Sequence, residues 1–213
     1  MYNSVGIVTY KTPTNTFSGT GTLMHKQFLG GGMKIFIITC KHVLPIADSA
    51  RQIQFEIHND SSKTGVTTLT IDIFDSVKRY LWYVKFDPAG NDVAVIDVTN
   101  IFLNFPLKNL QNKPIPHTLL ATRDSLYDNN VHVGDQVLFV GYPNFYFNTK
   151  NKRPIMRSGI IATPPEDVFY FDSILIKIYV NSRIPLNSKF DGFLIDGNPA
   201  GGLSGSLVFL KEQ

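Results

Sequence analysis

Residues 196–208 read Asp-Gly-Asn-Pro-Ala-Gly-Gly-Leu-Ser-Gly-Ser-Leu-Val, a glycine-rich loop that leads into an apolar strand. Glycines allow positive φ and let consecutive backbone N–H groups point at one spot. Acyl-transfer enzymes need such prepositioned donors for the oxyanion, at about 3 to 4 kcal/mol per donor. The candidate donors are the N–H groups of Gly202 and Ser204. An ordinary hairpin is the alternative, whereas phosphate binding is disfavoured because the loop has no P-loop lysine.

A histidine follows a second apolar strand. Residues 35–39 read Ile-Phe-Ile-Ile-Thr, and Cys40, Lys41 and His42 come next. A strand that ends this way presents an imidazole at a sheet edge facing a cleft. A hydrogen-bonded structural role is the alternative for His42. The remaining histidines have no comparable setting: His25, His58, His117 and His132.

A carboxylate opens a third apolar segment. Asp92 follows a Gly-Asn turn and precedes Val-Ala-Val-Ile. A buried carboxylate at this point would hold an imidazole in the tautomer whose other nitrogen accepts a proton. Capping of the turn is the alternative role for Asp92. Asp97 is the weaker candidate, because it lies toward the far end of the strand.

The composition indicates a globular, all-β protein. The chain has 213 residues, of which 43% are hydrophobic, enough for one large domain or two small lobes. Apolar residues form short runs rich in Val, Ile, Phe, Tyr and Thr, separated by Gly, Asn, Asp and Pro, with little helical spacing. The formal net charge of +3 is too small to indicate a polyanionic partner, so we expect no nucleic-acid binding.

The run of prolines at Pro106, Pro114 and Pro116 marks the linker between two lobes, because proline removes backbone donors and disfavours helix before it. We therefore expect an N-terminal lobe over 1–102, a linker over 103–117 and a C-terminal lobe over 118–213. One short helical turn is expected over 42–48. The expected strands are 5–10, 19–25, 33–39, 52–57, 67–74, 82–86, 92–98, 136–141, 157–162, 169–180, 192–195 and 206–210.

Taken together, the segments resemble the trypsin-like (chymotrypsin-fold) serine peptidases, and are most similar to the disulfide-poor, HtrA-like branch. Residues 18–23 (SGTGTL) are similar to the family's Gly-Ser-Gly strand, and 39–43 (TCKHV) to its Thr-Ala-x-His-Val segment. Residues 91–95 (NDVAV) resemble its Asp-x-Ala strand. Residues 133–143 resemble the opening strand of its second lobe, and 202–206 (GLSGS) its Gly-x-Ser-Gly-Gly loop. The resemblance covers nearly the whole chain.

This resemblance implies two six-stranded antiparallel β-barrels with a cleft between them. It implies a serine endopeptidase in which Ser204 is the nucleophile, His42 the general base and then acid, and Asp92 the group that orients His42. The oxyanion hole would be the N–H groups of Gly202 and Ser204. The substrate is a protein or peptide, its pocket would include Asn198 and Ala200, and we expect no metal and no cofactor.

One departure from the family concerns the end of the chain. Only nine residues follow Ser204, where the family has two further strands and usually a helix. The second barrel is therefore expected to lack its last strands, so that the sequence is a fragment or another element completes the barrel. This leaves open regulation by an activating protein partner or a fused effector domain. It also leaves open a catalytically inactive trypsin-fold module for peptide binding or assembly.

Cys40 is the single cysteine, so no internal disulfide is available, and a reducing compartment is the simpler interpretation. The first residues lack the pattern of a signal peptide, and no apolar stretch is long enough for a transmembrane helix. We therefore expect a cytoplasmic protein without membrane association. Cys40 itself is expected to be a buried, inert thiol rather than a nucleophile.

Overall fold

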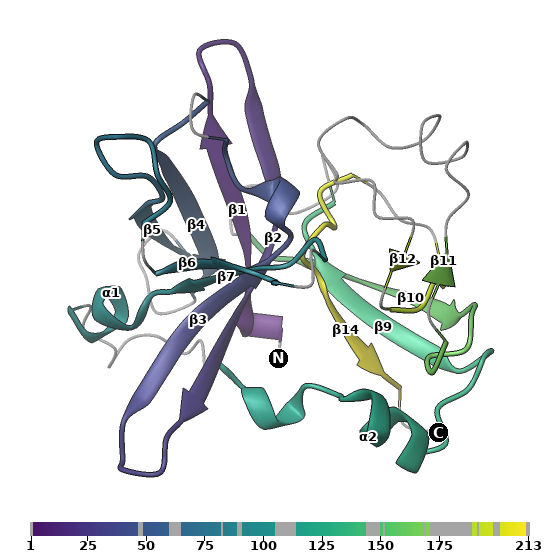
Figure 1. Ribbon diagram of the computed structural model, residues 1–213. Coiled ribbons are helices and arrows are strands. Elements are labelled where there is room, and N and C mark those ends of the chain that lie inside the picture. Colours follow the sequence, from purple (N-terminus) through teal and green to yellow (C-terminus); the bar gives the residue numbers. More distant parts are fainter. Residues whose placement is uncertain are drawn as a thin grey trace.

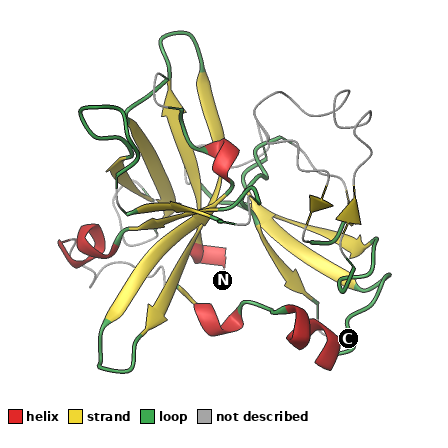
Figure 2. Ribbon diagram, viewed as in Figure 1, coloured by secondary structure: helices red, strands yellow, loops and turns green. Residues whose placement is uncertain are grey.

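A computed structural model shows two β-sheet lobes side by side (Figure 1). It describes residues 2–46, 49–59, 65–81, 83–88, 91–104, 114–143, 150, 152–167, 169–170, 189–190, 192–197 and 201–211. Strands dominate the described chain, and its helices are short (Figure 2). The architecture is mostly β, with an antiparallel sheet in each lobe, consistent with the chymotrypsin fold.

The first lobe is built on one sheet in the order β5-β4-β1-β2-β3-β7-β6, with β8 paired to β2 off this path. All neighbours along the path are antiparallel, and β8 joins β2 in parallel. The strands are β1 (Val5–Lys11), β2 (Thr16–Gln27), β3 (Met33–Thr39), β4 (Gln52–His58), β5 (Val66–Asp72), β6 (Val84–Phe86), β7 (Ala94–Asp97) and β8 (Ile115–Pro116).

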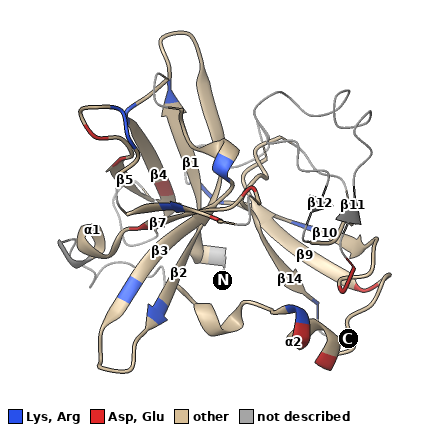
Figure 3. Cartoon of the chain, viewed as in Figure 1, with Lys and Arg blue, Asp and Glu red and all other residues tan. Residues whose placement is uncertain are grey.

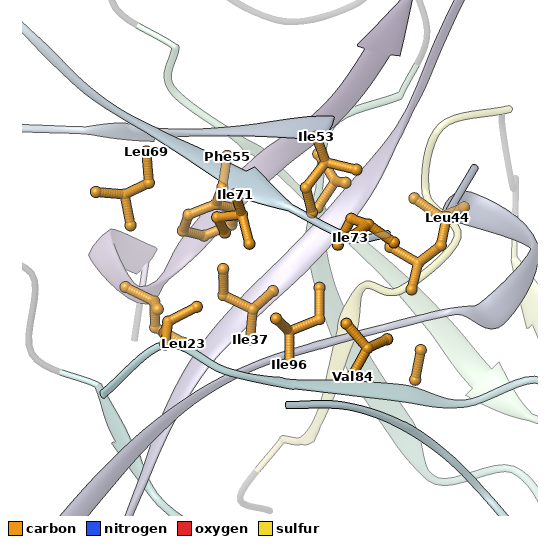
Figure 4. Packing of buried hydrophobic residues seen from close by; sticks show 14 of the residues in the cluster. Leu23, Ile37, Leu44, Ile53, Phe55, Leu69, Ile71, Ile73, Val84 and Ile96 are labelled. Atoms are coloured by element: carbon orange, nitrogen blue, oxygen red, sulfur yellow. The ribbon is translucent and has the colours of Figure 1, made fainter. Parts of the chain in front are cut away.

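Alternating burial explains why these residues form strands around one core. In β4, Ile53, Phe55 and Ile57 are fully buried, while Gln52 and Gln54 between and beside them are exposed. This period of two is what a strand with one face against a core requires. Side chains from several strands meet in a single apolar cluster (Figure 4). The seven strands predicted between residues 5 and 98 each correspond to an observed strand, with ends shifted by a few residues.

Within the described residues the sheet has eight strands, where the family resemblance implied six. The two shortest, β6 and β8, have three and two residues. The chain beyond β5 returns toward β6, since the Leu81 N–H donates to the Ile73 carbonyl at 2.9 Å and Phe74 forms a bridge with Tyr80. These contacts link the chain that leaves β5 to the chain that enters β6.

The second lobe has an antiparallel sheet in the order β13-β10-β9-β14 and a separate pair, β11 with β12. The strand predicted over 192–195 begins later, and that predicted over 169–180 lies mostly outside the described residues. The strands are β9 (Gln136–Gly141), β10 (Ile155–Ile161), β11 (Phe169–Tyr170), β12 (Lys189–Phe190), β13 (Ile195–Gly197) and β14 (Leu207–Leu210).

Several short helices connect the strands. The turn expected over 42–48 is a 3-10 helix, η2 (Lys41–Val43), and residues 47–48 lie outside the described part. The others were not predicted: η1 (Tyr2–Ser4), α1 (Thr99–Asn104), η4 (His117–Leu119) and α2 (Arg123–Asp128). Among the described residues, no helix is long and apolar enough to cross a membrane.

Apolar packing joins the two lobes. Val5 and Ile7 of β1 form a buried cluster with Val140 of β9 and Tyr142, which is fully buried. The Tyr142 hydroxyl lies 2.6 Å from the Lys152 carbonyl and 3.2 Å from the Val5 carbonyl. The two sheets are therefore held together by buried apolar side chains, and the Tyr142 hydroxyl within this contact has hydrogen-bond partners.

Candidate active site

The Asp92 carboxylate holds His42 at two points. Its Oδ1 accepts the His42 backbone N–H at 2.9 Å, and its Oδ2 is in hydrogen-bond contact with His42 Nδ1. Both side chains are partly open to solvent, at 30% exposure for His42 and 25% for Asp92. Because an ionised carboxylate only accepts hydrogen bonds, Nδ1 carries a proton and Nε2 of the neutral ring is left as an acceptor.

The strand pairing explains how residues fifty positions apart meet. Thr39, the last residue of β3, pairs with Ala94, the first residue of β7. Asp92 thus stands two residues before β7, next to the chain that leaves β3, and its carbonyl accepts the Lys41 N–H at 3.2 Å. The sequence prediction placed Asp92 at the opening of this strand. The structure places it just ahead, where its carboxylate contacts His42 rather than serving only as a turn cap.

Close packing fixes the position of η2, which carries His42. Val43 is 6% exposed and lies against Gly19 of β2. A Cβ on Gly19 would come within 2.6 Å of both Val43 methyl groups, so only glycine allows this approach. The Lys41 ammonium lies 5.2 Å from the Phe86 ring centroid, which adds a cation–π contact on the exposed side.

The loop that carries Ser204 crosses from the second lobe to the first. In Figure 1 this yellow segment before β14 lies at the border between the lobes, beside β2. The Ser204 carbonyl accepts the Thr20 N–H at 2.8 Å, and the Gly202 carbonyl accepts the Thr20 hydroxyl at 2.8 Å. The Thr20 carbonyl accepts the Thr39 hydroxyl at 2.7 Å, which places this loop beside the end of β3.

Gly205 brings the loop against the segment before His42. It has φ +87°, and a Cβ there would lie 2.1 Å from the Thr20 carbonyl oxygen and 2.7 Å from Thr39 Oγ1. Its backbone N–H hydrogen-bonds to the Cys40 sulfur. This contact places Ser204, the residue before Gly205, next to Cys40. Cys40 in turn precedes His42 by two residues.

The two candidate oxyanion donors are free in the described part of the chain, where neither the Gly202 nor the Ser204 N–H donates to another residue. Gly202 is buried and has φ +92°. The Leu203 carbonyl accepts the Ser206 N–H at 2.8 Å. Because the peptide unit is planar and trans, this bond directs the Ser204 N–H to the opposite side of the same unit.

Cys40 lies within this group. Burial and, to a smaller extent, the negative charge of Asp92 together raise the pKa of the Cys40 thiol to about 12. The thiol also hydrogen-bonds to the Asp92 carboxylate. The expectation of a poorly nucleophilic thiol fits this environment, but its contact with Asp92 was not predicted. The contact could not be seen in the sequence because Cys40 and Asp92 lie far apart along the chain. Knowledge that β3 pairs with β7 would have suggested it.

Among the described residues, no hydrogen bond joins the His42 ring to the Ser204 hydroxyl. Such bonds in unliganded enzymes commonly tighten only in the complex with substrate. Asn198 and Ala200, the expected pocket residues, lie outside the described residues. The arrangement thus contains a tautomer-fixed imidazole, a serine on an anchored loop and unpaired backbone donors.

Comparison with known proteins identifies the family of the chain. Residues 19–213 match the family described as the trypsin-like peptidase domain. No curated protein sequence matches the chain significantly. A solved serine endoprotease from Yersinia pestis is 17% identical with a TM-score of 0.49, and the match covers 98% of this chain and 50% of that one. The chain thus spans half the length of that protease.

Two further solved structures are similar. A thermostable serine protease, AL20, from an extremophilic microorganism is 17% identical with a TM-score of 0.48, covering 100% of this chain and 80% of its own. The inactivated protease paralogue S-I1 of the scabies mite is 15% identical with a TM-score of 0.50, covering 97% and 78%. Likeness at such identities concerns the fold. The family match, which extends from Gly19 to the last residue, shows that the chain belongs to the trypsin-like peptidase family.

Proposed function

We propose that this chain is a serine endopeptidase that hydrolyses peptide bonds through an acyl-enzyme on Ser204. The observation that carries the proposal is the double contact of Asp92 with His42, because it leaves His42 Nε2 as a proton acceptor. The family implies protein substrates.

In the proposed reaction, the Ser204 hydroxyl attacks the scissile carbonyl carbon while His42 Nε2 takes its proton. Asp92 stays ionised and stabilises the imidazolium that forms. The developing oxyanion accepts hydrogen bonds from the N–H groups of Gly202 and Ser204. His42 then gives the proton to the leaving amine, and a water molecule, activated in the same way, releases the acyl group from Ser204.

Thr20 supports this reaction by keeping the loop rigid. A backbone donor stabilises an oxyanion only if it is aligned before the charge appears. Thr20 fixes the carbonyls of Gly202 and Ser204 from a fully buried position. Rotation of these peptide units would break buried hydrogen bonds, so the donors remain aligned.

The charges over the two lobes are mixed, with basic and acidic residues interspersed in the described chain (Figure 3). This distribution supports a protein or peptide substrate better than a polyanion. The single cysteine supports a cytoplasmic protein, and neither a metal nor a cofactor is part of the proposed chemistry.

Labelling with a fluorophosphonate probe tests the proposal, since the probe reacts only with an activated serine. The parent chain should be labelled at one site, and Ser204→Ala should abolish the label. Ser206→Ala is the matched control two residues away and should keep it. No label on the folded parent, alone or with cell extract as a source of an activating partner, would refute the peptidase. Peptide binding without turnover would then support the inactive-module alternative.

A further inference from the structure

Three different metal-binding side chains converge beside the proposed nucleophile. Cys40 Sγ, a ring nitrogen of His42 and an Asp92 carboxylate oxygen all lie within 4.8 Å of one another. Cys40 and His42 flank Lys41 at the start of η2, and Asp92 reaches them from the residues before β7. The sequence does not bring these residues together, and the proposed peptide hydrolysis has no use for the thiol.

The donor set suits a borderline-soft divalent cation. Zn²⁺ binds thiolate, imidazole and carboxylate ligands at about 2.0 to 2.3 Å in tetrahedral geometry, which places neighbouring donor atoms about 3 to 4 Å apart. The donor atoms, which lie within 4.8 Å of one another, are at most about 1 to 2 Å farther apart than this spacing. One thiolate and one carboxylate balance the charge of the ion, so the partly buried site would be neutral overall.

The cluster is also accessible. His42 and Asp92 are 30% and 25% exposed, and Cys40 is partly exposed. An ion from solvent can therefore reach the three donors, and a water molecule can take the fourth position. Mg²⁺ and Ca²⁺ would be rejected, because they require mostly oxygen ligands.

We propose that Cys40, His42 and Asp92 form a binding site for Zn²⁺ or a similar thiophilic divalent cation, and that its occupation switches the peptidase off. The inhibitory part rests on the function proposed above. On binding, the proton of the Cys40 thiol passes to water, and the neutral imidazole shifts its proton from Nδ1 to Nε2 so that Nδ1 can bind the ion. Asp92 then holds the metal instead of the imidazole N–H, and because Nε2 now carries the ring proton, His42 cannot take a proton from Ser204.

Cobalt spectroscopy tests the site without using catalysis. Co²⁺ substitutes for Zn²⁺ and gives a near-ultraviolet charge-transfer band when a thiolate is a ligand. We expect this band in the full-length parent and in Ser204→Ala, its displacement by Zn²⁺, and its loss in Cys40→Ala. His132→Ala, which removes an exposed histidine on the second lobe, is the control that should keep the band. Absence of a thiolate band in the folded parent would overturn the site.

The inhibition is tested by fluorophosphonate labelling at increasing Zn²⁺. Each chain is compared with its own labelling rate without metal, and Cys40→Ala should need on the order of tenfold or more Zn²⁺ than the parent for the same fractional inhibition. Cys40→Ser is the second variant if Cys40→Ala does not fold, as judged by circular dichroism. Equal Zn²⁺ sensitivity of parent and variant would overturn the switch. If the chain gives the cobalt–thiolate band but is never labelled by the probe, the metal site is supported, whereas the peptidase activity and its inhibition by the metal are both refuted.

Discussion

The backbone N–H of Thr20 donates to the carbonyl of Ser204 at 2.8 Å, joining the middle of β2 in the first lobe to the proposed nucleophile of the second. Three further hydrogen bonds converge on the same threonine. Its hydroxyl donates to the Gly202 carbonyl at 2.8 Å and accepts the Tyr142 N–H at 3.0 Å, and its carbonyl accepts the Thr39 hydroxyl. Thr20 is therefore the anchor through which the second lobe positions its loop beside His42.

Replacing Thr20 by valine should damage both stability and activity. The change keeps the shape but removes the hydrogen bonds that the buried hydroxyl makes with the Tyr142 N–H and the Gly202 carbonyl, which should lower the free energy of unfolding by about 2 to 3 kcal/mol. Thr22→Val is the matched control on the same strand. Thr22 Oγ1 is buried with no hydrogen-bond partner among the described residues, so valine there should be neutral or stabilising. Urea unfolding measures the free energy of unfolding of both variants. Equal losses in Thr20→Val and Thr22→Val would contradict the anchor role of Thr20.

Gly205 should tolerate no side chain. Alanine there combines positive φ with a Cβ at 2.1 Å from the Thr20 carbonyl oxygen, so a loss of about 3 kcal/mol or more is expected, with loss of serine labelling. Gly134→Ala separates the two causes. Gly134 also has positive φ, at +96°, but nothing lies within 4 Å of the added Cβ. It should lose only about 1 kcal/mol and keep its labelling. If thermal or urea unfolding shows similar losses of unfolding free energy in Gly205→Ala and Gly134→Ala, the positive φ alone causes the loss and the contact of the Cβ with Thr20 adds nothing.

The strands of the first lobe were predictable because burial imposes a two-residue period that the sequence displays. In β4, apolar Ile53, Phe55 and Ile57 alternate with polar residues, so the pattern alone places the core face. Helix α2 was missed because only six residues form it, too few for a helical period. Its sole signal is local: Thr122 and Ser125 form a capping box.

The candidate site was predictable where a residue stands next to its strand, as for His42 and Asp92. Contacts between segments were not, because they depend on strand order and on the packing of the two lobes. Nothing in the sequence around Thr20 indicates that it bonds to Gly202 and Ser204, more than 180 positions away. The parallel pairing of β8 was hidden for a different reason: it contains Pro116, and proline indicates linker rather than strand.

Alkaline pH should destabilise the fold through Cys40. The pKa of its thiol is raised from an ordinary value of 9.0 to about 12, first by burial and then by the charge of Asp92. Below pH 9 the thiol is protonated in both folded and unfolded chains. Above it only the unfolded chain loses the proton, so the free energy of unfolding falls by up to about 1.4 kcal/mol per pH unit until the folded pKa is reached.

Cys40→Ala isolates this effect, because the partly buried phenols of Tyr80 and Tyr83, whose pKa values burial also raises, remain in the variant. Urea unfolding at about pH 8 and about pH 10.5 should show a steeper fall for the parent than for Cys40→Ala. If both chains lose the same free energy over this interval, the thiol ionises in the folded state as readily as in the unfolded one.

Asp92→Asn should remove catalysis while leaving the fold intact. The amide is nearly isosteric and its oxygen can still accept the His42 backbone N–H, but it carries no charge to stabilise an imidazolium and does not enforce the Nδ1–H tautomer. We expect kcat to fall by roughly 10⁴-fold with little change in KM.

Asp97→Asn, at the end of β7, is the matched control. Asp97 accepts hydrogen bonds from Lys34 at 3.1 Å and from the Thr99 hydroxyl at 2.6 Å, and it has no contact with His42. Its loss should reduce stability by about 1 kcal/mol and leave kcat unchanged. Steady-state kinetics on a quenched fluorescent peptide library measures both variants, and a kcat loss of equal size in the two would show that Asp92 acts on the fold rather than on the imidazole.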